Sequence, residues 1–326
     1  MTGGGGFVGS LLARSLLARG DNVRVIDSFI FGRDSLRSLM SQPGLEIVEG
    51  DIRDADEVRR SLRRVDAVVH LAAIANDPSA DLDPSLTRAV NRDAVIDLVR
   101  LSREAGVRRF VNASSASVYG VRDGPPSRET DATNPISLYG RYKLESEAVV
   151  LAADRPNFTT VSLRCATLCG ASPRPRLDLT MNILTYHAIS RGLITVNGGG
   201  QIRPQLHVRD AVDAYVRLID ASSVTVGGQA FNLARVNVTV LAGAELVRGI
   251  IGPDIEVAIA PVHDARSYAL SSAKIGRALG IRPWRPVADA VRELARSLRR
   301  GDIEEPESGR HRNVVWMSAI EAQAVH

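Results

Sequence analysis

The sequence predicts an α/β protein built around a doubly wound parallel sheet. Short apolar runs typical of buried strands alternate with helical patterns through the first half of the chain. Hydrophobic residues make up 44% of the 326 residues, which is enough apolar surface to bury a large core. A chain of this length forms one large domain or two unequal ones.

The expected elements follow one another in regular alternation up to residue 170. A helical apolar stripe at 7–19 ends at Gly20. The expected strands are residues 23–27, 45–49, 67–72, 108–114 and 159–168, and the expected longer helices are residues 85–105 and 139–153. Strands joined by helices in this way run parallel, with the helices on both faces of the sheet.

The pattern changes after Gly170, where prolines, arginines and the glycine run 198–200 interrupt the alternation. A further helix is expected near 181–191. The expected organisation is a first domain of residues 1–170 and 205–235, a smaller mixed α/β domain of residues 171–204 and 236–300, and a tail of residues 301–326. This tail is highly charged and is expected to be loosely held, although its stretch 313–320 is apolar enough to dock on the body.

The composition argues against several classes of function. The 41 cationic residues are 39 arginines and two lysines, they alternate with acidic residues, and aromatic residues make up only 4%. This leaves no basic stripe with stacking platforms for nucleic acid. No stretch approaches the roughly 20 apolar residues of a membrane span, no signal peptide is recognisable, and the histidines and cysteines lack metal-ligand spacing. We therefore expect a cytoplasmic protein that binds no nucleic acid, no membrane and no metal.

A glycine-rich turn opens the first expected helix, with Gly3, Gly6 and Gly9 spaced three apart. Such glycines let the backbone approach a pyrophosphate, which then binds the amides at the helix start. Alone the spacing is weak evidence, and a flexible glycine-rich terminus is the alternative. A Rossmann sheet also needs a central strand before this turn. Because its loss would orphan hydrogen bonds on both neighbouring strands, we expect that the true start lies upstream of Met1.

Acidic residues at two strand ends extend this interpretation. Asp27 ends the strand after the turn, where a carboxylate accepts hydrogen bonds from the adenosine ribose. It also repels the extra phosphate of NADP, so NAD is favoured, although nearby Arg33 leaves NADP open. Asp51 and Ile52 follow the next strand and are expected beside the adenine, unless Asp51 is only a turn residue.

The sharper signal is the pair Tyr139 and Lys143, which are four residues apart on an expected helix and therefore share one face. A neighbouring ammonium favours the phenolate and so prepares a tyrosine for proton transfer. The alternative is a surface pair, but a lysine is rare in this arginine-rich chain. Upstream, the serine-rich end of a strand at 113–117 offers a hydroxyl to a substrate oxygen, unless it is an ordinary turn.

Together and in order, these motifs resemble the extended short-chain dehydrogenase/reductase family, and within it the NAD-dependent nucleotide-sugar epimerases and dehydratases. The resemblance covers most of the chain. The segments that carry it are 2–9, 50–54, 70–73, Asn91, 114–120, 139–143, 201–210, 231–232 and 279–283.

The resemblance implies a role for each residue that matches a family motif. Tyr139 is the implied general base and acid, Lys143 holds the nicotinamide ribose and lowers the tyrosine pKa, and Ser115, rather than Ser114, orients the reacting oxygen. The implied cofactor-binding residues are Gly3, Gly6, Phe7, Val8, Gly9, Asp27, Asp51, Ile52, Leu71, Ala72, Ala73, Asn91, Tyr139 and Lys143. The implied substrate residues are Ser117, Asn182, Arg203 and Arg266. A homodimer through the helices at 85–105 and 139–153 is implied as well, and the smaller domain would bind the substrate.

Departures from the family pattern narrow the expected chemistry. Dehydratases carry an acidic pair directly after the catalytic serine or threonine, where this chain has Ala116 and Ser117. Decarboxylating relatives usually keep the glutamate, and 3,5-epimerising relatives place a cysteine at the second position. The small pair here looks most like the 4-epimerases. Pro261 stands where the family has an arginine, so Arg266 or Arg174 is expected to replace its contact.

The expected activity is therefore NAD-dependent 4-epimerisation of a nucleotide sugar through a transient 4-keto sugar. Two alternatives remain. An NAD(P)-dependent 4-ketoreductase or dehydrogenase would consume its cofactor, whereas an epimerase would retain it. A non-catalytic Rossmann scaffold would bind no dinucleotide.

Overall fold

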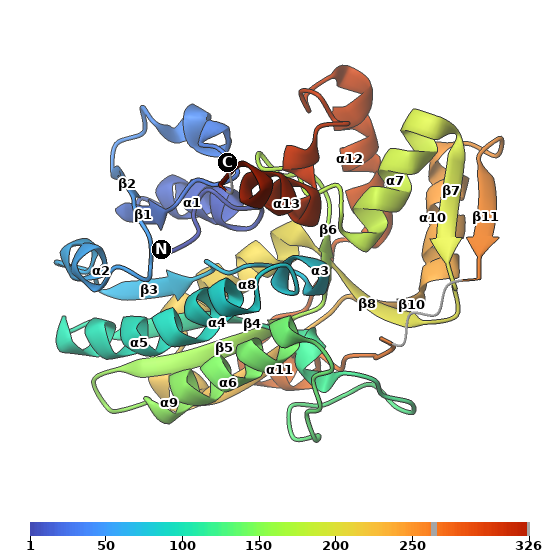
Figure 1. Ribbon diagram of the computed structural model, residues 1–326. Coiled ribbons are helices and arrows are strands. Elements are labelled where there is room, and N and C mark those ends of the chain that lie inside the picture. Colours follow the sequence, from blue (N-terminus) through green and yellow to red (C-terminus); the bar gives the residue numbers. More distant parts are fainter. Residues whose placement is uncertain (262–265, 325–326) are drawn as a thin grey trace.

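A parallel sheet forms one half of the computed structural model, which describes residues 1–261 and 266–324 (Figure 1). Its strands are β1 (Val23–Asp27), β2 (Leu45–Glu49), β3 (Ala67–His70), β4 (Arg109–Ser115), β5 (Thr159–Cys165) and β9 (Gln229–Leu233). The order is β2-β1 and then β3-β4-β5-β9, and every pairing is parallel. The predicted doubly wound α/β class is confirmed.

The start of the chain joins the two parts of this sheet. Thr2 bridges in parallel to Ile26 of β1 on one side and to His70 of β3 on the other. Its amide donates to Val69 O at 3.0 Å, and the amide of Gly3 donates to Ile26 O at 2.9 Å. These bonds place the glycine turn directly after the centre of the sheet, as a Rossmann arrangement requires.

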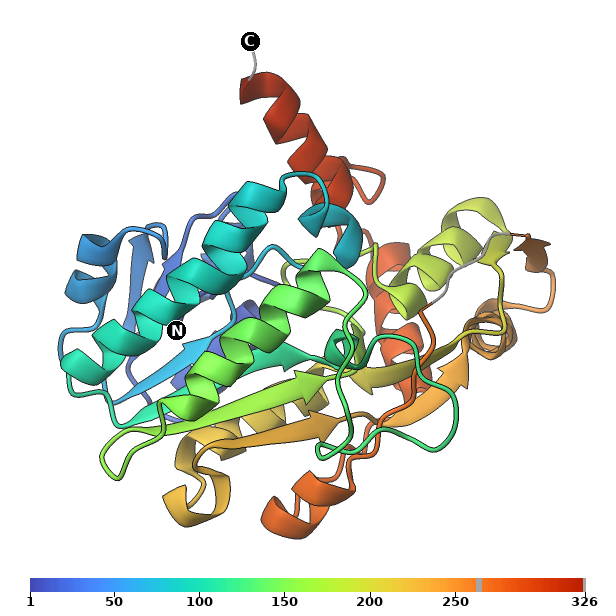
Figure 2. The same cartoon turned by 60° about the horizontal axis from the view of Figure 1, so that its bottom comes forward.

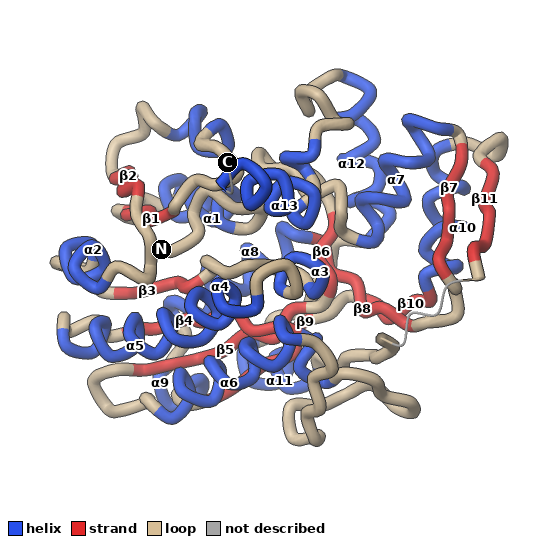
Figure 3. Tube along the Cα trace, in the orientation of Figure 1, coloured by secondary structure: helices blue, strands red, loops and turns tan. Residues whose placement is uncertain are grey.

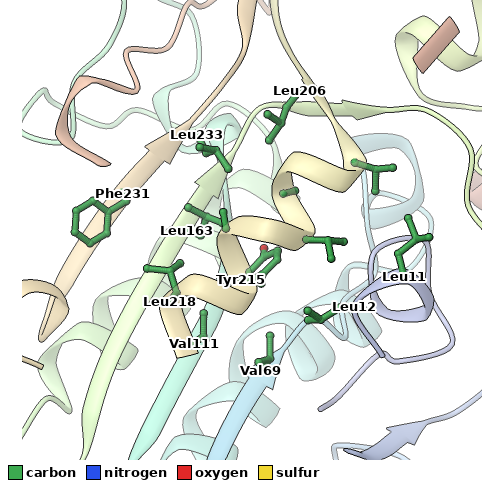
Figure 4. Close-up of a cluster of buried hydrophobic side chains, with 14 of the residues drawn as sticks. Leu11, Leu12, Val69, Val111, Leu163, Leu206, Tyr215, Leu218, Phe231 and Leu233 are labelled. Carbon is green, nitrogen blue, oxygen red and sulfur yellow. The ribbon is translucent and has the colours of Figure 1, made fainter. Parts of the chain in front are cut away.

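Helices cover both faces of the parallel sheet (Figure 3). One face carries α1 (Gly9–Ala18) and α8 (Val208–Asp220), and the other carries α2 (Ala55–Ser61), α5 (Ala94–Glu104) and α6 (Leu138–Ala152). Because side chains alternate along a strand, neighbouring residues of β4 enter different cores. Val111 packs with Leu12 and Leu218 (Figure 4), whereas Phe110 packs on the α5 side.

The second half of the molecule is mixed. Its strands are β6 (Thr167–Cys169), β7 (Leu193–Asn197), β8 (Ile202–His207), β10 (Val236–Thr239) and β11 (Glu256–Ala260). β8 pairs in parallel with β6 and antiparallel with β10, and β7 pairs in parallel with β11. The helices α7 (Thr180–Arg191), α10 (Val240–Ile251) and α12 (Val287–Arg300) pack around residues such as Leu184 and Val247.

Several short elements lie between these strands and helices. They are η1 (Asp34–Leu39), α3 (Asp77–Ala80), α4 (Pro84–Arg88), the π turn η2 (Ala89–Asp93), η3 (Ala116–Tyr119), α9 (Ser223–Val226), α11 (Ala273–Leu279) and η4 (Gly309–His311). The expected helix at 85–105 is therefore α4 and α5 joined through a π turn. The expected strand at 159–168 is divided at Ala166 into β5 and β6.

The C-terminal segment forms α13 (Asn313–Ala324), which is anchored at its first turn and projects away from the body beyond it (Figure 2). The amide of Asn313 donates to Asp178 Oδ2 at 2.9 Å, and Trp316 Nε1 donates to Ile30 O at 2.5 Å. Met317 is buried. The segment expected as a loosely held tail thus contacts both halves of the molecule through residues 313–317. Of the helices described, none is long and apolar enough to span a membrane.

Candidate active site

A cavity of about 1100 Å³ opens at the carboxyl ends of the parallel strands. Asp27, Leu71, Ser115 and Cys165, which end or directly follow β1, β3, β4 and β5, all line it. Residues of α7, β7 and β8 line it from the other half. Open α/β sheets bind their ligands at this edge, so the cavity is the candidate active site.

The glycine turn at one end of the cavity fits a dinucleotide. Gly3 has φ +70°, and a Cβ on it would lie 2.6 Å from Ala72 N. A Cβ on Gly9 would lie 2.2 Å from Gly3 O, so no larger residue fits at either position. No side chain caps the start of α1, where the amide of Ser10 donates to Gly6 O at 3.1 Å, and a helix start of this kind favours phosphate oxygens. Gly6, Phe7 and Val8 also line the cavity.

Asp27 braces this turn. Its Oδ2 accepts a hydrogen bond from Gly5 N and its Oδ1 accepts one from Phe29 N, both at 2.8 Å. Burial raises the pKa of Asp27, and the two backbone bonds and Arg174 oppose that rise. The carboxylate therefore fixes the backbone of the glycine turn, and its contact with a ribose stays a prediction.

The loops after β2 and β3 form the next part of the wall. Asp51 and Ile52 line the cavity, and burial of Asp51 is outweighed by hydrogen bonds from Arg53, which hold its pKa below the usual value. Leu71, Ala72 and Ala73 also line the cavity.

Asn91 does not line the cavity. It is buried in the π turn η2, its Oδ1 accepts from Ile74 N at 2.8 Å, and its Nδ2 donates to Ile74 O at 2.9 Å. Asn91 therefore fastens the loop that lines the cavity, and its direct contact with the cofactor stays a prediction. A π turn is a frequent device for aiming one side chain inward.

Tyr139, Lys143 and Ser115 lie together in the cavity wall. α6 starts after Ser137, whose Oγ caps the amide of Gly140 at 3.1 Å, and Tyr139 is in its first turn. The Ser115 side chain lies close enough to the Tyr139 hydroxyl to affect its pKa. Lys143 Nζ donates to Ala113 O at 2.9 Å and lies 5.9 Å from the centre of the Tyr139 ring.

Burial dominates the acid–base properties of this group. It raises the pKa of Tyr139 to about 12, and the hydrogen bond from Ser115 acts in the opposite direction. Burial also lowers the pKa of Lys143 to about 8. The expected lowering of the tyrosine pKa by Lys143 is not among these effects: the groups that lower it are Ser115 and Arg176, and desolvation of the phenol is larger than both.

The serines at the end of β4 differ in their contacts. Ser115 Oγ accepts hydrogen bonds from Ser117 N at 3.2 Å and from Ser117 Oγ at 2.9 Å. Ser114 Oγ is buried and has no partner among the described residues. Ser117 lines the cavity, and Ala116 is buried. Of the two neighbours, Ser115 is the one that contacts Tyr139.

Arg203 and Arg266 line the opposite side of the cavity. Arg203 donates to the backbone oxygen of Arg266, and its guanidinium lies 5.9 Å from the centre of the Tyr268 ring. Arg266 forms an ion pair with Asp77 at 2.6 Å, and Asp77 Oδ1 also accepts from Ser137 Oγ at 2.6 Å. This chain of contacts ties the cationic side of the cavity to the start of α6.

Asn182 does not face the cavity. It is buried in α7, where its Oδ1 accepts from Gly170 N and its Nδ2 donates to Gly170 O and Arg176 O. The predicted substrate contact is corrected, because all of its polar atoms hold the backbone after β6.

Sequence reasoning missed other polar residues that line the cavity, among them Asp77, Asp178 and Asn313. Asp77 is the first residue of α3, seven residues after the end of β3, and this position near a strand end is the one signal that could have indicated it. Within residues 1–261 and 266–324 there is no group of three or more histidine, cysteine, aspartate or glutamate residues placed to hold a metal ion.

Comparisons with known proteins agree with this geometry. Residues 1–234 match the model of the NAD-dependent epimerase/dehydratase family. A UDP-glucose 4-epimerase from Lactobacillus helveticus is 29% identical over 90% of this chain and 93% of its own. A UDP-glucuronic acid decarboxylase from Arabidopsis thaliana is 33% identical over 80% of this chain and 60% of its own.

A solved dTDP-glucose 4,6-dehydratase from Streptomyces venezuelae, with NAD bound, has a TM-score of 0.85. It is 26% identical, and the likeness covers 94% of this chain and 98% of that one. The expected family and the expected cofactor are both confirmed. The uncapped glycine turn, the braced Asp27 and the half-buried Tyr139 beside Ser115 thus belong to an enzyme of the NAD-dependent epimerase/dehydratase family.

Proposed function

We propose that the protein epimerises a nucleotide sugar at C4 through a 4-keto intermediate. The observation that carries this proposal is the pair after Ser115, which provides no acid or base: Ala116 is buried, and Ser117 Oγ donates to Ser115. Removal of water or of a carboxylate needs further acid–base groups near the sugar. The nearby carboxylate of Asp77 is occupied by Arg266 and Ser137.

The chain's own residues would divide the work as follows. Tyr139 removes the proton of the 4-hydroxyl and returns it in the second half of the reaction, while Ser115 holds the same oxygen. Lys143 Nζ, fixed by Ala113 O, would hold the nicotinamide ribose. NAD, held by the glycine turn, Asp27 and Lys143, would supply reversible hydride exchange with C4 of the sugar. Arg203 and Arg266 supply positive charge for the nucleotide diphosphate.

The test is incubation with UDP-, GDP- and dTDP-sugars in deuterated water, with products read by NMR. The expected product is the C4 epimer, with no deuterium at C4 and no net consumption of added NAD or NADH. A 4-keto-6-deoxy product or loss of carbon dioxide would overturn the proposal. Stoichiometric oxidation of NAD(P)H would instead assign a ketoreductase.

Two tyrosine variants test the assigned base. Tyr139→Phe is expected to lower turnover by about 10²–10⁴-fold, the usual contribution of a general acid or base. Tyr142→Phe is the matched control on the same helix, because Tyr142 does not line the cavity. Equal activity of the two variants would contradict the role of Tyr139.

A further inference from the structure

The loop after β6 is fastened to the glycine turn and brings an arginine to it. Ser172 Oγ donates to Phe7 O at 2.7 Å and shares a hydrogen bond with Ser10 Oγ at 3.2 Å. Phe7 belongs to the turn and Ser10 to the first turn of α1. Arg174, two residues further along the loop, lines the same cavity.

The surroundings of Arg174 place it on the cofactor side of the cavity. Its guanidinium lies 4.0 Å from the centre of the Phe31 ring, in the segment that follows β1. The carboxylate of Asp27 acts on it electrostatically. Arg174 therefore lies between the strand end that faces the adenosine ribose and the turn that faces the phosphates.

Arg174 differs from its neighbour Arg176 in how its charge is paired. Arg176 binds both oxygens of Asp178, at 2.8 and 2.9 Å. The hydrogen-bond partner of Arg174 is neutral, because its Nη2 donates to Asn313 Oδ1 at 2.6 Å. Within the ranges that the structure describes, no carboxylate forms an ion pair with Arg174, although only 6% of it is exposed.

A buried guanidinium without a paired anion is costly. In keeping with this, burial lowers the pKa of Arg174 to about 9. An anionic ligand in the cavity would remove the cost, and guanidinium groups bind phosphate through strong charge-assisted hydrogen bonds.

We propose that Arg174 binds the pyrophosphate of NAD, and that Asn313 at the start of α13 positions its guanidinium. The proposal rests on the NAD site and not on which reaction the sugar undergoes. Asn313 is suited to this role because its Nδ2 also donates to Ala75 O at 3.2 Å, close to the loop 71–73 of the cavity wall. The C-terminal helix is thereby part of the cofactor site.

The test is titration calorimetry of the full chain with NAD⁺, ADP and adenosine. Arg174→Gln is expected to weaken the binding of NAD⁺ and ADP about ten- to hundredfold, which is the usual contribution of a hydrogen bond to a charged group. The affinity for adenosine should not change. An equal loss for adenosine, or unchanged NAD⁺ affinity, would overturn the proposal. Arg292→Gln, at an exposed arginine of α12, is the control and should bind all three ligands normally.

The role of Asn313 is tested by coupling. Asn313→Ala is expected to weaken NAD⁺ binding less than Arg174→Gln does. The double variant should bind NAD⁺ no more weakly than Arg174→Gln alone. Additive losses would refute positioning of Arg174 by Asn313.

Thermal melting separates a binding role from a structural one. Because Arg174→Gln removes a buried charge that has no paired anion, the variant without NAD⁺ should melt no lower than the parent protein. NAD⁺ should raise the melting temperature of the variant less than that of the parent. If Arg174→Gln melts well below the parent without NAD⁺, the residue is structural and the proposal fails.

Discussion

At the residue scale, Ser115 opposes the effect of burial on Tyr139. Burial raises the pKa of Tyr139 to about 12, and the bond from Ser115 lowers it. Removing that bond in Ser115→Ala therefore raises the pKa further, so less phenolate is present at any pH below it. We expect the rising alkaline limb of the pH–rate profile to move to higher pH. Single-turnover rates between pH 6 and pH 10 measure this shift.

Ser114→Ala provides the comparison for this prediction. Ser114 Oγ is buried and has no partner among the described residues, so its removal should leave the pH profile in place. Because the pKa of about 12 lies above this pH range, its rise appears as an equal fall of the single-turnover rate at every pH between 6 and 10. Unchanged rates in Ser115→Ala, or an equal fall in Ser114→Ala, would contradict control of the tyrosine pKa by Ser115.

The sequence predicted those site residues whose position follows from local geometry. The spacing of Tyr139 and Lys143 places both on one helix face, and Ser115 lies at the end of a strand. Asn182 was misassigned because an amide in a helix has the same sequence context whether it faces a ligand or a backbone. The contact of Arg174 with Asn313 spans 139 residues of sequence, so no local pattern indicates it.

At the element scale, α6 carries the catalytic pair, and a buried ion pair anchors it to the sheet. Glu147, one turn after Lys143, binds Arg164 of β5 at 2.5 Å, with 3% and 7% of the two side chains exposed. Glu147→Gln leaves the Arg164 charge buried and unpaired. We expect the free energy of unfolding, measured by denaturant titration, to fall by about 3 kcal/mol or more.

Glu145→Gln on the same helix is the matched control. Glu145 pairs with Arg92 near the surface, with 41% and 33% of these side chains exposed. Such pairs contribute less than about 1 kcal/mol. Similar losses in the two variants would show that burial of the Glu147 pair does not matter for the anchoring of α6.

Element boundaries could be predicted where one periodicity runs without interruption. β1 and β2 begin and end at the expected residues. The π turn at 89–93 was not predicted, because one extra residue in a helix leaves the apolar stripe nearly unchanged. The break at Ala166 was also missed, since its strands pair in two different sheets while the apolar run continues. The central pairing of Thr2 arises from partners 24 and 68 residues away.

At the scale of the whole molecule, the cavity depends on contacts between distant parts of the chain. Arg266 reaches Asp77 across 189 residues, and Asn313 reaches Ala75 across 238. Positive side chains from both halves, such as Lys143 of α6 and Arg203 of β8, line one volume. A cavity lined by positive side chains attracts ligands that carry several phosphates, such as a dinucleotide or a nucleotide sugar.

The last prediction concerns assembly. We propose a homodimer through α5 and α6, which pack together on one face of the sheet (Figure 2). Light scattering should then give twice the chain mass of 35.1 kDa.

Two variants test which face forms the interface. Ala148 is exposed on α6, so Ala148→Arg would place a charge in this interface. Charged residues are depleted in the cores of protein interfaces. We expect this variant to be a folded monomer. Ala18→Arg, at an exposed position of α1 on the opposite face, should remain a dimer. The proposed interface would be wrong if the parent protein had the mass of a single chain at micromolar concentration, or if Ala148→Arg remained a dimer.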